Sequence, residues 1–189
     1  MLTNWGYSVD ELPPIVSAPE FMALNPGLSS TTGQIMAVLD AVSASVRDWC
    51  GWHVAPNLGC DFIGNGEGQL LMLPCMGVSD VETVTVYTEP ITYYEWNGAG
   101  MIRLTSGKFP RGWRNVSVRY KAGFTTEAIG AVVSQIAANM LVASPGVAEE
   151  HVGSAGITYN RTGDGITGGI SLLERDRELL APYKLARAW

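Results

Sequence analysis

The residues that could bind a metal ion or act as nucleophiles are the three cysteines and two histidines of this chain. Cys50 and His53 stand three residues apart, and Cys60 and Cys75 follow at wider, irregular intervals. Zinc sites favour closely spaced pairs of ligands, and only Cys50 and His53 form such a pair. Cys50 also falls in an apolar helical stripe, where a free cysteine is most often a small buried residue. We therefore expect no metal site.

Two further motifs that can carry chemistry are weak. Residues 64–68 read GNGEG, but a phosphate-binding loop needs a following helix and usually a lysine, whereas GQLLML is typical of a strand. A hairpin turn is therefore favoured. Neither His53 nor His151 lies in a recognisable nucleophile motif. Glu149 and Glu150 are typical of solvated charge, so we expect no catalytic residue, no cofactor and a non-enzymatic protein.

Composition limits the class of protein. The chain has 189 residues and is 47% hydrophobic, which is enough for one domain or for one domain with an insertion. It has no apolar run of about 18 residues and no basic start followed by an apolar segment, so we expect neither a membrane span nor a secretory signal. Three irregularly spaced cysteines argue against a disulfide framework and favour a reducing compartment.

Charge is unevenly placed along the chain. The net charge is −6, residues 51–100 contain six acids and no Lys or Arg, and residues 101–121 contain six basic residues and no acid. A protein that grips nucleic acid over a wide surface is normally basic, which excludes that class here. Solvated strand faces and a hairpin loop are one interpretation of the basic segment, and contact with an acidic partner is the other.

The elements that must position these residues begin with a central helix at about 31–51. Its apolar residues recur at steps of three and four, which lays one stripe along a helix. Thr31 and Gln34 have the capping-box spacing at its start, and Gly51 can take the left-handed conformation that ends a helix. The stripe contains Ile35, Val38, Leu39, Val42, Val46, Trp49 and Cys50.

Other helical segments surround this one in sequence. In residues 1–16 the apolar residues do not recur at a regular spacing, and this segment is predicted to form an N-terminal arm. A capping box at Ser17 and Glu20 begins a short helix that Asn25-Pro26-Gly27 ends. A second long helix is predicted at about 126–142. A Gly-rich loop at 146–169, with one possible strand at 157–161, precedes a last short helix that starts near Ser171 and Glu174.

Between the two long helices, the spacing at which apolar residues recur changes from about 3.6 residues towards 2. This change predicts a β-rich insertion at about 57–121. We expect an α+β fold, a small helical bundle with an antiparallel β-rich insertion, in which residues 17–189 form a single domain. The predicted strands are Asp61–Gly64, Gln69–Leu73, Val81–Thr88, Thr92–Trp96, Met101–Leu104 and Val116–Tyr120.

Three segments, in this order and spacing, resemble the head–tail connector (adaptor) proteins of long-tailed bacteriophages. The first is the helix ending VRDWCGWHV, the second is the strand–Pro-Arg-Gly–strand–helix run at 100–141, and the third is a Gly-rich loop followed by LLERDRELLAPYK. Together they cover most of residues 17–184. The arm and the tail after Lys184 are not covered.

The resemblance implies a virion structural protein at the head–tail junction, present in the host cytoplasm during assembly. Such proteins form a closed ring, here expected to have twelve subunits, beneath the portal protein. The ring extends the DNA channel, through which DNA passes without sequence-specific binding, towards a downstream stopper or tail-terminator protein. Ring closure needs two different complementary faces, which the acidic and basic segments could supply.

The resemblance also points to contact residues. The C-terminal segment of such adaptors engages the portal, which here makes Tyr183, Leu185, Arg187 and Trp189 candidate portal contacts. Packing of Tyr183 and Leu185 on the central helix is the alternative. The basic segment, rather than the resemblance, makes Lys108, Arg111 and Arg114 candidate contacts to a neighbouring subunit or a tail protein.

Two other functions stay open on the sequence alone. One is a soluble β-rich ligand-binding or catalytic domain with flanking helices, and the other is a different neck protein of the virion.

Overall fold

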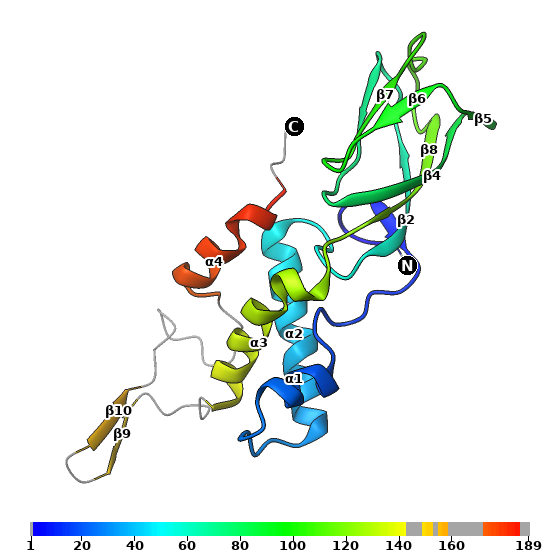
Figure 1. The fold of residues 1–189 in the computed structure, drawn as a ribbon. Helices are drawn as coiled ribbons and strands as arrows, with labels where there is room; N and C mark the ends of the chain where they lie inside the picture. The colour runs from blue at the N-terminus through cyan, green and yellow to red at the C-terminus, as the bar shows by residue number, and fades with distance from the viewer. Residues whose placement is uncertain (1, 143–148, 153–154, 159–171, 186–189) are drawn as a thin grey trace. The chain divides into compact units, whose positions relative to one another are not determined.

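The computed structural model describes residues 2–142, 149–152, 155–158 and 172–185 (Figure 1). Its helices are α1 (Ala18–Leu24), α2 (Thr32–Cys50), α3 (Thr126–Val142) and α4 (Glu174–Leu180), and a short 3-10 helix, Ala181–Tyr183, follows α4. The predicted α+β fold is confirmed, and so are the two long helices and the antiparallel β-rich region between them. Among the described residues, no helix combines the length and the apolar content needed to cross a membrane.

The helix boundaries are where the capping motifs put them. The Ser17 side chain accepts a hydrogen bond from the Glu20 N–H, and the Glu20 carboxylate accepts one from the Ser17 N–H. Thr31 and Gln34 exchange the equivalent pair at the start of α2. Gly51 ends α2 at a φ of 81° and donates its N–H to the Arg47 carbonyl. Ser171, which we expected to cap the last helix, lies outside the described residues.

Most strands lie between α2 and α3 in the sequence and form two antiparallel sheets, the first of which β1 joins from the N-terminal segment, and β9 and β10 form a separate hairpin. The first sheet has the order β1-β2-β8-β4-β5 and the second has the order β3-β7-β6. The strands of these two sheets are β1 (Tyr7–Val9), β2 (Leu58–Gly64), β3 (Leu70–Met72), β4 (Val78–Val86), β5 (Glu89–Ile91), β6 (Tyr94–Trp96), β7 (Met101–Leu104) and β8 (Val116–Ala122).

Three observed strands were not expected. Tyr7–Val9 pairs with β2, so part of the N-terminal arm belongs to the first sheet. Glu89–Ile91 forms the edge strand β5. In the Gly-rich segment, β9 (Glu149–Val152) pairs with β10 (Ala155–Thr158), and β10 overlaps the single strand predicted there. The rest of that predicted loop lies outside the described residues.

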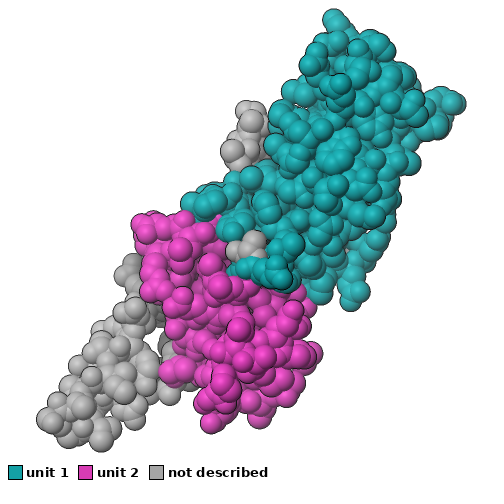
Figure 2. All heavy atoms as spheres, in the orientation of Figure 1, with its two compact units in different colours: residues 1–13, 47–129, 181–189 teal, residues 14–46, 130–180 magenta. Residues whose placement is uncertain are grey.

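The chain divides into two compact units, which Figure 2 colours separately. The β-rich unit contains Met1–Pro13, Arg47–Ile129 and Ala181–Trp189, and the helical unit contains Pro14–Val46 and Gly130–Leu180.

The core of the helical unit is built on the predicted stripe of α2. Ile35, Leu39 and Val42 are buried, and so is Phe21 of α1. The segment before α1 is tied to α2 because the Ile15 N–H donates to Ser43 Oγ at 2.9 Å. A β-carbon at Gly130 of α3 would lie 3.4 Å from the Val16 side chain, which is ordinary van der Waals contact, so α3 packs against the segment before α1.

The centre of the β-rich unit is β8, which pairs with both β2 and β4. Its residues alternate as a half-buried strand requires, with Val116, Val118 and Tyr120 buried and Ser117 and Arg119 partly exposed. Ala122, at its end, is also buried. With seven residues at about 3.4 Å each, β8 separates its first and last residues by about 20 Å.

Candidate partner-contact sites

The first candidate site is the C-terminal segment, at the Ala122 end of β8. The Tyr183 ring packs edge-on against Phe124, with ring centroids 5.3 Å apart, and the Tyr183 carbonyl accepts a hydrogen bond from Trp52 Nε1 at 2.7 Å. The Leu185 N–H donates to the Cys50 carbonyl at 2.9 Å. Tyr183 and Leu185 therefore pack within their own chain, beside the end of α2. Arg187 and Trp189 lie outside the described residues.

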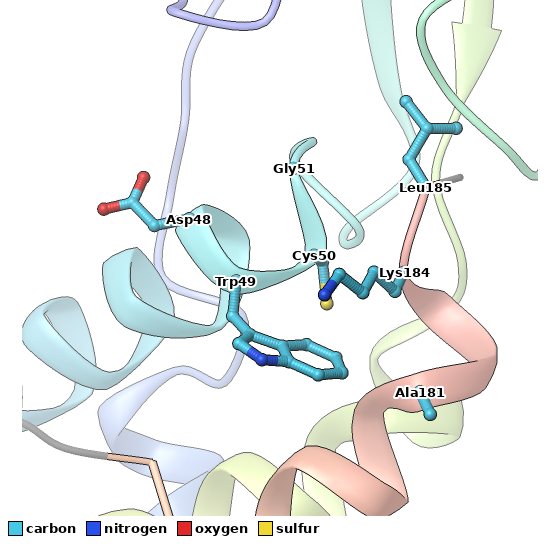
Figure 3. Close-up of a pocket in the computed structure, with 7 residues that line it drawn as sticks. All are labelled: Asp48, Trp49, Cys50, Gly51, Ala181, Lys184 and Leu185. Carbon is cyan, nitrogen blue, oxygen red and sulfur yellow. The ribbon is translucent and has the colours of Figure 1, made fainter. Parts of the chain in front are cut away.

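A surface hollow of about 590 Å³ lies beside this segment. Figure 3 shows its lining, to which α2 contributes Trp49 and Cys50 and the C-terminal segment contributes Lys184 and Leu185. The Lys184 ammonium lies 4.6 Å from the centre of the Trp49 ring, a cation–π contact. The hollow therefore combines an aromatic ring with a cation and with the carboxylate of Asp48.

Buried polar groups support this end of the unit. Arg47 is only 4% exposed, and its guanidinium donates to the carbonyls of Pro13, His53 and Ala55. These bonds join the N-terminal segment to the chain that follows α2. A buried charge is costly unless it is hydrogen-bonded in this way, so Arg47 fixes the path of three segments.

His53 is the second buried polar group. Its Nε2 is 2.8 Å from the Ala122 carbonyl, which can only accept, so Nε2 carries the proton. Its Nδ1 therefore accepts from the Tyr7 hydroxyl at 2.7 Å, and that hydroxyl also accepts from the His53 N–H. Burial lowers the pKa of His53 to about 4, and burial also raises the pKa of Tyr7. Both groups are neutral near pH 7 and hold β1 to the end of α2.

The second candidate site is the loop between β7 and β8, residues 105–115, called here the basic loop. Lys108, Arg111 and Arg114 are all exposed on it, which fits both a solvated loop and contact with a partner. Trp113 is 81% exposed between two of them, although large aromatic side chains are normally covered. The loop joins β8 at Val116. This residue lies about 20 Å along the strand from Ala122, the end of β8 beside the C-terminal site.

The basic loop is braced by the connection between β2 and β3. Asn65 Oδ1 accepts from the Arg114 N–H at 2.7 Å, and Asn115 Oδ1 accepts from the Gly66 N–H at 2.7 Å. Phe109 is buried, and its N–H donates to the Gly68 carbonyl. Arg114 has a φ of 49°, a conformation that a side-chain-bearing residue keeps only when its surroundings hold it. The loop therefore presents its exposed side chains from a fixed backbone.

Arg119 and Lys121 of β8 are the centre of an ion-pair network in the β-rich unit. Arg119 lies within 4 Å of Asp10, Asp61 and Glu82, and Lys121 lies within 4 Å of Asp80 and Glu82. The hydrogen bonds that the Arg119 guanidinium donates to the carboxylates of Asp10 and Asp61 raise the pKa of Arg119. Because Asp10 directly follows β1, this network ties the edge strand to the sheet.

The residues considered for metal binding or catalysis do not assemble into a site. Cys50, Cys60 and Cys75 are free and buried, and burial raises the pKa of each thiol to about 12. Such thiols are poor nucleophiles and poor metal ligands. Within the described ranges, no group of three or more His, Cys, Asp or Glu side chains could hold a metal ion.

Sequence reasoning missed two features of these sites. The first is the exposure of Trp113. This residue stands between Gly112 and Arg114 in a turn-forming segment, and its position there was a signal in the sequence that its ring is exposed. The roles of Arg47 and His53 had no local signal, because their partners lie far away in the sequence.

No family model matches the sequence, and no curated protein matches it significantly. Three solved structures contain chains of similar fold. They are the neck of an empty GTA particle computed with C6 symmetry (TM-score 0.63), the neck of a native GTA particle computed with C12 symmetry (0.61) and the virion of a native gene transfer agent (GTA) particle (0.59).

In each comparison the identity is 14%, and the match covers 97% of this chain and 97% of the other. The likeness therefore includes the helices and the β-rich region together rather than one common motif. At this identity it establishes the architecture alone, so the chain has a fold that also occurs in the necks of gene transfer agent particles.

Proposed function

We propose that this chain is a non-enzymatic structural protein of a phage-like particle and acts as a head–tail connector in its neck. Twelve copies form a closed ring under the portal protein, extend the DNA channel and join the head to a stopper or tail-terminator protein. DNA passes through the lumen without sequence-specific binding. The protein is in the host cytoplasm during assembly and in the virion afterwards.

The observation that carries this proposal is the full-length similarity of fold to chains from GTA particles, two of them described as necks. The C6 and C12 symmetries belong to those particles, and they support a ring for this chain as well. The order of sequence segments, which resembles head–tail connectors, supports the same conclusion independently.

The two candidate sites give the connector two separate contact regions. We propose that the C-terminal segment, with Tyr183, Leu185, Arg187 and Trp189, contacts the portal. Lys108, Arg111 and Arg114 contact a neighbouring subunit or a tail protein. Because β8 separates these regions by about 20 Å, one unit can contact two different surfaces at once.

Sedimentation with incomplete particles tests the proposal. The purified chain is mixed with portal-bearing, DNA-filled heads that lack it, and the heads are pelleted through a density gradient. We expect the chain to sediment with these heads and not with shells that lack a portal. Equal amounts in both pellets, or none in either, would contradict a connector role.

A further inference from the structure

The helical unit contains a long exposed segment without charge. None of the residues between Glu20 and Asp40 is charged, and most of them are exposed to solvent. This stretch, residues 21–39, is called here the uncharged segment. It contains the end of α1, the turn that follows and the first part of α2 (Figure 1). Because the solvent-facing side of a surface helix normally carries charged residues, this is an unusual surface.

Three large apolar side chains of the uncharged segment are exposed. Met22 is 39% exposed, Leu24 is 67% exposed and Met36 is 54% exposed. Single exposed apolar side chains are common, but these three occur together in a stretch that has no charged residue. The centres of protein interfaces have the same composition, because they are depleted of charge and enriched in methionine.

Hydrogen bonds and buried side chains fix the backbone of this segment. Asn25 Nδ2 donates to the Phe21 carbonyl at 3.0 Å, and the Leu28 N–H donates to the Asn25 carbonyl at 3.2 Å. Phe21 and Ile35, on either side of the turn, are both buried. The exposed side chains are therefore presented from a preformed surface, which can bind a partner without first being ordered.

Nearby parts of the helical unit are also poor in charge. In residues 14–46 and 130–142, Glu20 and Asp40 are the only charged residues. The exposed residues in this part of α3 are Ala131, Gln135, Asn139 and Val142.

A second copy of the chain is the occupant that this surface fits. Each copy has a net charge of −6, so two copies repel each other unless they meet where charge is absent. Contact through the uncharged segment places no charge of that segment at the interface, which avoids like charges facing each other. The two contact regions of the proposed function both belong to the β-rich unit, so neither of them uses this surface.

We infer that the uncharged segment packs against the neighbouring copy in the ring, with Met22, Leu24 and Met36 at the centre of the contact. A closed ring needs two different surfaces on each subunit, and the uncharged segment supplies one of them. This inference rests on the proposed function, because it concerns the ring of copies.

Photo-cross-linking within assembled particles identifies what covers this surface. The chain is produced with p-benzoylphenylalanine in place of Met36, purified particles are irradiated, and the adducts are identified by mass spectrometry. We expect an adduct that joins two copies of this chain. Adducts with other polypeptides alone, or no adduct between chains, would overturn the inference.

Insertion of a carboxylate tests the same contact by its effect on assembly. Leu24→Glu and Met36→Glu change side chains that are exposed in the isolated chain, so each variant should keep the native melting temperature. Copies per purified particle, counted by quantitative mass spectrometry, should fall at least about tenfold, because burying an unpaired charge is costly. The matched control is Leu70→Glu on β3, a residue that is 48% exposed in the β-rich unit, and it should assemble normally.

Native copy numbers for either helical-unit variant, or an equal loss for Leu70→Glu, would also overturn the inference. The cross-link needs no added charge, so it decides the question even where a glutamate variant fails to fold. Absence of the native chain itself from purified particles would instead contradict the proposed function. The two failures are therefore distinguishable.

Discussion

Arg47, His53 and Tyr7 are the polar side chains on which the end of α2 depends. Arg47 and His53 stand six residues apart, on either side of the helix end at Cys50, and Tyr7 comes from the N-terminal strand. Each is buried and hydrogen-bonded. The cost of burying them is therefore offset by defined partners, and the result is one arrangement of β1, the helix end and β8.

Stability should depend on pH through His53. Its pKa of about 4 in the folded chain lies below the ordinary value of 6.5, so the unfolded chain binds more protons between these values. The stabilisation is full above about pH 6.5 and is lost as the pH falls towards 4. We expect the free energy of unfolding to drop by about 2 kcal/mol from pH 7 to pH 5 through this group, measured by urea denaturation.

The other histidine provides the matched control for this measurement. The chain contains only His53 and His151. A His151→Gln variant should keep the pH dependence, whereas His53→Gln should be less stable at pH 7 and nearly flat between pH 7 and 5. An equal pH slope in the His53→Gln variant and the native chain would show that His53 does not titrate as described.

At the scale of elements, the junction between β8 and α3 is set by Gly123. Its φ of 123° is one that residues with side chains rarely adopt, and a β-carbon there would collide with the backbone of Pro56 and Asn57. The chain can pass this point only without a side chain, because both obstacles are backbone atoms.

A Gly123→Ala variant should therefore be destabilised by more than about 2 kcal/mol, measured as the shift in urea midpoint. The matched control is Gly33→Ala in the first turn of α2, where a β-carbon would meet nothing within 4 Å. Alanine is the better helix former, so this variant should be neutral or more stable by up to about 1 kcal/mol. Similar losses at both positions would argue against a steric role for Gly123.

Elements with a strong local signal were predictable from the sequence. The apolar stripe and the caps of α2 predict its bounds to within one residue at each end. The alternation of apolar and polar residues identifies β8. The strand β1 has three residues and β5 contains Pro90, so neither carries a pattern of its own. Their pairing depends on distant partners, β2 and β4, which no local pattern shows.

The candidate sites were predictable in part for the same reason. The exposure of Lys108, Arg111 and Arg114 follows from a turn-rich, charged segment. The packing of Tyr183 on Phe124 depends on residues 59 positions apart in the chain, a separation that no local pattern spans.

At the scale of the whole molecule, the C-terminal segment is the proposed link to the portal. Deleting residues 186–189 removes Arg187 and Trp189 but spares the bond from the Leu185 N–H to the Cys50 carbonyl. We expect the truncated chain to keep its melting temperature. Its affinity for portal-bearing heads should fall at least about tenfold in sedimentation, because a large aromatic and an arginine are typical interface anchors.

Unchanged binding by the truncated chain would remove the tail from the portal contact, while a lower melting temperature would show that it stabilises the fold instead. A Leu173→Ala variant, which shortens an exposed apolar side chain before α4, serves as the control and should bind like the native chain.

The most direct test of the connector role is a cryo-electron microscopy reconstruction of the neck of purified particles, at a resolution that identifies side chains. The account predicts a closed ring of twelve copies of this chain between the portal and the tail, with the uncharged segment of each copy in contact with its neighbour. A neck in which every ring is built from other polypeptides, with this chain absent, would contradict it.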